Sequence, residues 1–299
     1  MPHIALVTED RYTAAEAAAD DWYLQNILDE DRLLSDALAR HDLSAARVSW
    51  SDPAVDWSQF RCAVIRSTWD YFERFAEFAA WLDRVQQVTH VCNPPATLAW
   101  NVDKHYLADL EARSVRVVPS RFIELGDSAR LAALLDETLW REAVVKPCIS
   151  GGARHTYRVN HSNAKEIDAR LAPLLGQESF LLQPFKQSIV QQGEDTLMMF
   201  GGRYTHAVRK RAKPGDFRVQ DDHGGTVELY EPTAEQIDLA QRAMAACDEL
   251  PVYGRVDMVE DAQGHAAVME LELVEPELWL RLHPEAAEVM AEELVRWLG

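Results

Sequence analysis

An alternation of acidic and aliphatic residues near the end of the chain constrains its fold more than any other stretch. In VMELELVEPEL, residues 268–278, Glu270 and Glu272 alternate with Leu271 and Leu273. Successive side chains of a β-strand point to opposite faces, so this pattern predicts a strand with one apolar face and one acidic face. Taken alone, the acidic face has two equally good interpretations, a solvated edge strand or a metal site.

The composition is typical of a globular protein and limits the choice of ligand. The chain has 299 residues, of which 47% are hydrophobic and 26% charged, enough for two or three domains with their own cores. Its 30 Lys and Arg residues face 49 Asp and Glu residues, a net charge of −19, which disfavours nucleic acid and anionic membrane surfaces as partners. An anionic ligand therefore needs local basic groups, whereas Mg²⁺ is attracted by the overall field.

The cysteines and the N-terminus predict a cytoplasmic protein. Cys62, Cys92, Cys148 and Cys247 form no CxxC motif and lie mostly in apolar runs, so we expect free, buried thiols. The first residues, MPHIALVTED, have no basic segment before a short apolar run, and no window approaches 18 consecutive apolar residues. Neither a signal peptide nor a membrane span is expected.

Strands and helices alternate over the first 95 residues. HIALVTED and CAVIRSTWDY predict buried strands that end in polar residues, and helices are expected over 14–40 and 75–88. In an open α/β sheet, ligands collect at the carboxyl ends of the strands, where Arg66, Ser67, Thr68 and Asp70 would lie. Capping of the next helix explains these polar residues equally well.

The rest of the chain mixes helices with antiparallel strands. We expect helices over 101–113, 128–139, 233–249 and 286–298, and strands in VRVVPS, RFIE, AVVKPC, FLLQPF, DTLMMF, RYTHAVRKR and TVELY. The segments VYGRVDMV and AAVMELEL, joined by the turn EDAQGH, predict a hairpin.

That hairpin brings three carboxylates together. Asp257 would lie on one strand and Glu270 with Glu272 on its partner, all able to converge on one face. Carboxylates this close repel one another and take up protons unless a cation neutralises them, and hard oxygen ligands favour Mg²⁺ or Mn²⁺. Lys146 lies within an apolar run that is expected to be buried, and a buried lysine needs an anion as partner. A structural salt bridge would also explain one such lysine.

The order of these motifs resembles that of the ATP-grasp superfamily. The matching positions are Lys104, the KP at Lys146, SGG at 150–152, QPF at 183–185, GED at 193–195, Lys210, Arg218, Asp257 and the E-x-E at 270–272. The spacing is most similar to the glutathione synthetase branch, and RSTWDY, WNVDKHYL, GDFRVQ and MELELVEP resemble the D-cycloserine synthetases and their uncharacterised relatives. No Walker A sequence is present, so a P-loop site is not expected.

The resemblance implies an α/β (α+β) protein of three lobes. A Rossmann-like N-terminal substrate domain would span residues 1–100, and two α+β lobes, 101–186 with a phosphate flap and 187–299 with a metal site, would enclose ATP. It also implies an ATP-dependent ligase that activates a small amino-acid-like carboxylate as an acyl phosphate. A nitrogen nucleophile then attacks, either from a second molecule or within the same one, leaving ADP and phosphate.

The resemblance further implies a role for each matching residue. The residues that would bind the nucleotide are Lys104 and Lys146 at the phosphates, Ser150, Gly151 and Gly152 in the flap, Gln183, Pro184 and Phe185 in the hinge beside adenine, and Glu194 or Asp195 near the ribose. Lys210 and Arg218 would stabilise the developing acyl phosphate, and Asp257, Glu270 and Glu272 would hold two Mg²⁺ ions, with Mn²⁺ as the alternative. The family often has Glu-x-Asn at 270–272 and Glu at 183, but a carboxylate in place of the amide still offers oxygen ligands.

The substrate would lie between the N-terminal lobe and the segment after the metal strand. The candidates are Arg66, Ser67, Thr68, Asp70, Arg255, Glu275 and Arg281. Arg255 shares a strand face with Asp257 and is also a catalytic candidate, although an ion pair with a nearby glutamate explains it as well. Glu275 and Glu277 are further candidates for contact with a substrate amine, but a solvated loop is the preferred interpretation of these two residues.

Two alternatives stay open at this point. A dipeptide ligase or a peptide-modifying ligase would use the same core, and the substrate loops do not separate them from a cyclising enzyme. An ATP-binding regulatory protein would be expected to lack the metal carboxylates or the phosphate lysines, and both sets are present. Dimers are common among similar proteins, so a homodimer is an additional expectation.

Overall fold

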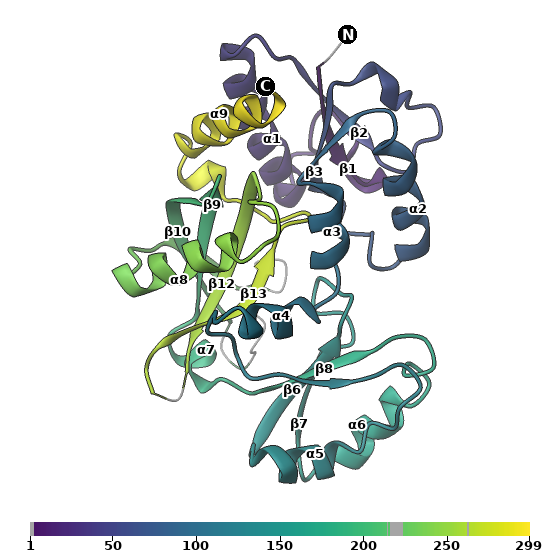
Figure 1. The fold of residues 1–299 in the computed structure, drawn as a ribbon, viewed down its shortest axis with the longest axis vertical. Coiled ribbons are helices and arrows are strands. Elements are labelled where there is room, and N and C mark those ends of the chain that lie inside the picture. The colour runs from purple at the N-terminus through teal and green to yellow at the C-terminus, as the bar shows by residue number, and fades with distance from the viewer. Residues whose placement is uncertain (1–2, 214, 216–223, 262) are drawn as a thin grey trace.

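Three β-sheets organise the chain, each built from a different stretch of the sequence (Figure 1). The computed structural model describes residues 3–213, 215, 224–261 and 263–299. Arg218, a predicted site residue, lies outside the described residues. None of the described helices combines the length and the apolar composition that crossing a bilayer requires. The four cysteines are free and buried, as predicted.

The N-terminal sheet is parallel, with the strand order β2-β1-β3-β4. It contains β1 (Ile4–Thr8), β2 (Ala45–Ser49), β3 (Cys62–Ser67) and β4 (His90–Cys92), with helices α1 (Trp22–Arg40) and α2 (Phe75–Val85) between strands. Every residue of β1 is buried, as expected for a strand covered on both faces. Helix α1 begins later than the predicted residue 14, because the Asp21 carboxylate accepts a hydrogen bond from the Leu24 N–H and caps the helix there.

The central sheet is antiparallel, with the order β5-β8-β6-β7. Helices α3 (Pro95–Asn101) and α4 (Tyr106–Ala112) lead into β5 (Arg121–Ile123), α5 (Leu131–Thr138), β6 (Glu142–Pro147), β7 (Tyr157–Asn160), α6 (Ala164–Leu171) and β8 (Phe180–Pro184). The predicted helix over 101–113 is wrong in its first turn, because the Lys104 N–H bonds to the Cys148 carbonyl instead of continuing a helix. The predicted strand VRVVPS makes only one isolated bridge, between Val117 and Val268.

The C-terminal sheet is also antiparallel and has the order β11-β10-β9-β12-β13. Its elements are α7 (Gln187–Gln191), β9 (Glu194–Phe200), β10 (Arg203–Arg211), β11 (Thr226–Leu229), α8 (Ala234–Ala245), β12 (Tyr253–Glu260), β13 (Ala266–Glu272) and α9 (Ala286–Leu298). The predicted hairpin is confirmed: Asp257 pairs with Glu270, and Arg255 with Glu272. Directly paired residues of antiparallel strands point to the same face, so these four side chains share one surface.

The N-terminal and C-terminal sheets are joined by buried contacts. The Asn93 amide donates to the carbonyls of Tyr253 and Leu273, both at 2.8 Å, and its oxygen accepts from the Val252 N–H at 2.7 Å. Helix α9 lies against α1 although they are at opposite ends of the sequence (Figure 1). One apolar core therefore contains residues of both sheets, whereas the central sheet has a core of its own formed by residues 123–182. The predicted domain boundaries near 100 and 186 stay a prediction.

Candidate active site

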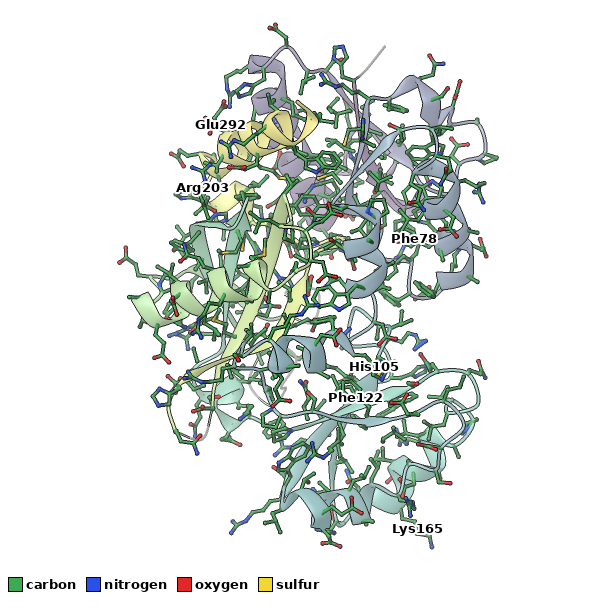
Figure 2. All side chains as sticks on the ribbon, viewed as in Figure 1. Phe78, His105, Phe122, Lys165, Arg203 and Glu292 are labelled. Carbon is green, nitrogen blue, oxygen red and sulfur yellow. The ribbon has the colours of Figure 1, made fainter. Side chains whose placement is uncertain are left out.

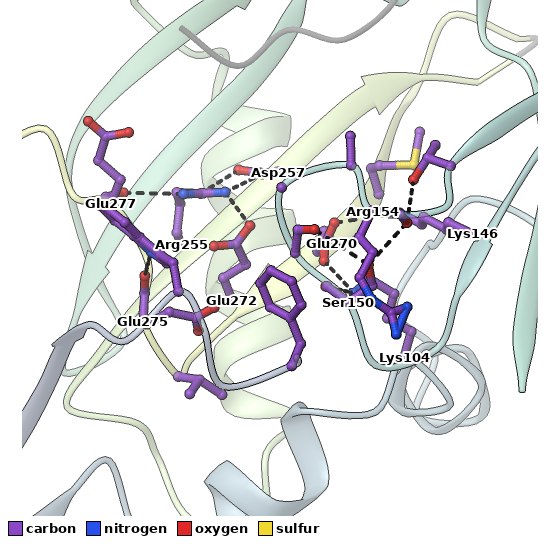
Figure 3. Close-up of a pocket in the computed structure, with 18 of the residues that line it drawn as sticks. Lys104, Lys146, Ser150, Arg154, Arg255, Asp257, Glu270, Glu272, Glu275 and Glu277 are labelled. Carbon is purple, nitrogen blue, oxygen red and sulfur yellow. Dashed lines mark hydrogen bonds and ion pairs between the residues drawn. The ribbon is translucent and has the colours of Figure 1, made fainter. Parts of the chain in front are cut away.

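A cavity of about 470 Å³ lies where the three parts of the chain meet. Its walls come from the C-terminal hairpin, from β6 and β8 of the central sheet, from the segment between α3 and α4, and from the loop after β3. Figure 3 shows how charged side chains from these elements converge in it. A cavity of this size suits a small ligand.

Glu270 is held between two lysines from other elements. Its carboxylate lies 3.1 Å from Lys104 Nζ and 3.5 Å from Lys146 Nζ (Figure 3). Lys104 is 5% exposed and also donates to the Ser150 carbonyl at 2.7 Å. Burial raises the pKa of Glu270, but the two lysine charges outweigh it and lower that pKa to about 2. Glu270 is therefore an anion, and the lysines occupy positions from which they could bind another one.

Asp257 is the centre of a second ion-pair group. Arg255 forms a fork of two hydrogen bonds to its carboxylate at 3.0 and 2.9 Å, and Lys210 Nζ lies 2.9 Å away. Lys210 also pairs with Glu194, and Arg255 with Glu272. Burial opposes the charge of Asp257, but Arg255 and Lys210 hold its pKa below the usual range. Arg255 and Lys210 also lie near the Trp279 ring, with the Arg255 guanidinium carbon 5.3 Å from its centroid.

Two further carboxyl groups are less well neutralised. Burial raises the pKa of Glu272 to about 7, because Arg255 compensates only in part and Asp257 and Glu270 add negative charge. Burial and the charge of Glu272 raise the pKa of Glu275 to about 8. The cavity thus contains more carboxyl groups than the protein's own cations neutralise. Asp257, Glu270 and Glu272 supply the oxygen donors that Mg²⁺ takes, and this excess fits an additional cation.

The predicted flap and hinge residues also line the cavity. They are Ser150, Gly151, Gly152, Gln183, Pro184 and Phe185. Gly152 has φ +55°, and a Cβ at Gly151 would come within 2.6 Å of the Phe72 ring, so the loop lies against the N-terminal part of the chain. Gln183 is buried and its amide donates to Ser120 Oγ at 3.2 Å.

The structure separates the two candidates of the GED motif. Glu194 lines the cavity, whereas Asp195 lies outside it and pairs with Arg209 at 2.6 and 2.9 Å. Asp195 also accepts a hydrogen bond from Gln236 on α8. Adjacent residues of a strand face opposite ways, so only one of them could reach a ligand here.

Most of the predicted substrate residues are not brought to the cavity. Arg66 is buried between Glu30 and Asp31, and Arg281 pairs with Glu30 and Glu277. Two others bond within the N-terminal part, Ser67 to Thr8 at 2.7 Å and Asp70 to Trp50 and Arg74. The hydroxyl of Thr68 is buried and has no hydrogen-bond partner among the described residues. Of the substrate candidates, Arg255, Glu275 and Glu277 do line the cavity.

In the loop after β3, aromatic side chains face the cavity, where polar side chains of the same loop were predicted. Trp69, Tyr71 and Phe72, from the same loop as Ser67 and Asp70, line the cavity. Trp69 also packs against Tyr12 and Tyr23, with ring centroids 5.6 and 5.8 Å apart. Sequence reasoning missed this cluster, although three aromatic residues directly after a strand, in WDYF, were a visible signal.

Comparison with known proteins agrees with the fold. Residues 4–93 match the family described as D-cycloserine synthetase DcsG, N-terminal domain. The chain is 37% identical over 277 residues to the cycloserine biosynthesis protein DcsG of Streptomyces lavendulae, covering 86% of this chain and 89% of that protein. The crystal structure of D-cycloserine synthetase DcsG matches with a TM-score of 0.88 and 34% identity over 99% of each chain. The ATP-grasp ligase PsnB, in complex with a precursor variant, Mg and ADP, matches with a TM-score of 0.63 and 15% identity, over 100% of this chain and 99% of that one.

Proposed function

Because the chain belongs to the D-cycloserine synthetase family of ATP-grasp ligases, we propose that this cavity is its active site. The chain is an ATP-dependent ligase that joins an activated carboxylate to a nitrogen nucleophile. The observation that carries the assignment of the site is the arrangement around Glu270, where two lysines and three acidic residues from separate elements meet in one cavity. This is the charge pattern that a metal–nucleotide complex requires.

When a nucleotide binds, its phosphates would replace the Glu270 carboxylate as the ion-pair partner of Lys104 and Lys146. Both lysines already lie within 3.5 Å of a carboxylate oxygen, so they are positioned to contact a phosphate oxygen after a small movement. Glu270, Glu272 and Asp257 would then hold Mg²⁺, which neutralises the phosphates during transfer. We propose two Mg²⁺ ions, with Mn²⁺ as the alternative, since three carboxylates offer enough oxygens for two octahedral ions that keep some of their water.

Arg255 and Lys210 would stabilise the transferring phosphoryl group. Both are buried and both are oriented by Asp257, so they are fixed in place before the ligand arrives. The Ser150–Gly152 loop, closed against Phe72, would exclude water from an acyl phosphate that hydrolyses readily. The role predicted for Arg218 stays a prediction.

Glu275 would bind the ammonium group of an amino-acid substrate. It lines the cavity with 9% of its surface exposed, and its carbonyl accepts a hydrogen bond from Trp69 Nε1 at 3.1 Å. Within the described part of the chain, the paired cations of the cavity are bound to other carboxylates, and none forms an ion pair with Glu275. A buried carboxylate without a cation of its own is suited to a cationic substrate group.

Glu275→Gln is therefore expected to raise the KM of the amino-acid substrate about 10- to 100-fold, the effect of losing a charged hydrogen bond. The KM of ATP should change little, since Glu275 contacts neither lysine. Steady-state kinetics with each substrate varied in turn would measure both. Glu73→Gln is the matched control, because Glu73 also lines the cavity but is exposed. A rise in the KM of ATP alone would instead place Glu275 at the nucleotide.

The cavity has the size of a small-molecule site. Its volume of about 470 Å³ lies within the range usual for such sites. We propose a small amino-acid-like substrate, with ring closure within one molecule as the reaction that brings no second ligand. A dipeptide ligase remains the alternative, and the homodimer stays a prediction.

The function is tested by ADP release from Mg²⁺-ATP across a panel of amino acids, dipeptides and O-ureidoserine-like compounds. We expect stimulation by a small amino-acid-like compound, with phosphate released in equal amount. Product analysis then distinguishes a ring from an amide between two molecules. If Mg²⁺-ATP does not bind at all, the assignment of the cavity is wrong; if only dipeptides or peptides stimulate, the small-substrate proposal is wrong and the ligase assignment stands.

A further inference from the structure

A second group of side chains that could bind a metal lies next to Lys104, outside the cavity. Asp103, His105 and Cys148 each offer one ligand atom, and these atoms all lie within 4.8 Å of one another. Two of the residues come from the turn before α4, and the third directly follows β6. None of the three lines the cavity, so this group is separate from the carboxylates proposed for Mg²⁺.

The hydrogen-bond partners of His105 fit a metal-ligating imidazole. Nε2 lies 3.2 Å from the Glu124 carboxylate, which suits an Nε2–H donor, and the ring stacks on Phe122 with centroids 4.2 Å apart. Figure 2 shows His105 and Phe122 next to each other. With the proton on Nε2, the lone pair of Nδ1 points at Asp103 Oδ1, 2.5 Å away. Two acceptors this close require a cation between them, either a second proton on the ring or a metal ion.

We propose that Asp103, His105 and Cys148 form a binding site for a borderline-soft divalent cation, with Zn²⁺ as the best fit. One thiolate, one imidazole and one carboxylate are ligands that Zn²⁺ accepts, leaving a fourth position for water, whereas Mg²⁺ avoids sulfur and nitrogen. Glu124 is the outer carboxylate that holds the ring through Nε2–H. On binding, the Cys148 thiol loses its proton to solvent as the sulfur–metal bond forms, and no electron is transferred.

The site is open on one side and closed on the other. The side chains of Asp103 and His105 are 39% and 37% exposed, so an ion can reach them from solvent. Cys148 is 2% exposed and would lie beneath the bound ion, shielded from oxidation. A bound ion would join the two segments that carry the cavity lysines, because Lys104 stands between Asp103 and His105 and Lys146 precedes Cys148 by two residues.

Co²⁺ is the probe that tests this site, because a cobalt–thiolate bond gives a near-ultraviolet charge-transfer band that carboxylate ligands do not. Chelator-treated full-length protein is titrated with Co²⁺ and then with Zn²⁺. We expect the band to saturate at one Co²⁺ per chain, to disappear when Zn²⁺ displaces Co²⁺, and to be absent from Cys148→Ser. Glu124→Gln should bind Co²⁺ about 10- to 100-fold more weakly, the usual effect of losing an outer-shell partner.

Cys247→Ser is the matched control, because Cys247 is also a free, buried thiol and lies elsewhere in the chain, just after α8. It should keep the band at full strength. His105→Gln replaces the imidazole with a polar side chain of similar length and provides a second variant if Cys148→Ser is unstable. This variant should lose tight Co²⁺ binding as well. Co²⁺ binding without a thiolate band, or a band that survives both Cys148→Ser and His105→Gln, would overturn the proposal.

Discussion

Glu270→Gln is expected to lower kcat/KM for Mg²⁺-ATP by about 10²–10³-fold, the range seen when one preorganised charge is removed from a reacting centre. In the wild-type protein the carboxylate lies beside Lys104 and Lys146 and faces the proposed metal site. Glutamine keeps the shape but neither the charge nor the second acceptor oxygen. Both lysines lose their counter-ion, and the Mg²⁺ proposed to bridge the phosphates loses a ligand.

A second measurement separates this explanation from simple damage to the fold. Metal-free ATP should bind Glu270→Gln more tightly than it binds wild type, because the ion pairs of Lys104 and Lys146 with Glu270 no longer have to be broken. Calorimetry with and without Mg²⁺ would show this inversion. Glu166→Gln is the control, since Glu166 forms an exposed pair with Arg170 on α6 and does not line the cavity. Unchanged turnover in Glu270→Gln would remove Glu270 from the reaction.

Asp257→Asn is expected to lower the free energy of unfolding by about 3–5 kcal/mol, the cost of removing one partner from a buried ion pair. Asp257 is 3% exposed and accepts from Arg255 and Lys210 at 2.9 to 3.0 Å. Asparagine would leave two buried cations with less neutralising charge, although Glu194 and Glu272 keep part of it. Urea denaturation followed by circular dichroism would measure the loss.

Asp195→Asn is the matched control for this prediction. Asp195 lies in the same sheet and also pairs with an arginine through two hydrogen bonds, at 2.6 and 2.9 Å, but its partner Arg209 is nearer the surface. Partial solvent screening should keep its effect below that of Asp257→Asn. Equal losses in the two variants would show that the burial of Asp257 does not set its contribution.

The parts of the site that the sequence predicted well depend on local pairing. The alternation around Glu270 and Glu272 predicted a hairpin with Asp257 opposite, and a hairpin register is decided within about twenty residues of chain. The motif order likewise indicated Lys104 and Lys146, which the structure brings to Glu270.

The placements that the sequence did not predict depend on packing between distant segments. Arg66 was predicted to face a substrate, but helix α1 places Glu30 and Asp31 against it from 35 residues away. Arg281 is drawn to the same Glu30 across 251 positions. A strand-end loop can be located from its polar residues, but which of its side chains face the cavity depends on which helix covers the sheet.

The arrangement of the apolar cores determines how the walls of the cavity are joined. The N-terminal and C-terminal sheets share one core and are tied by Asn93. The central sheet has a core of its own, and Leu181 of β8 also packs into the core of the C-terminal sheet. Lys146 lies on β6 of the central sheet and Glu270 on β13 of the C-terminal sheet. Their ion pair therefore bridges two sheets, and we expect a nucleotide that binds between them to break this pair before it contacts both groups.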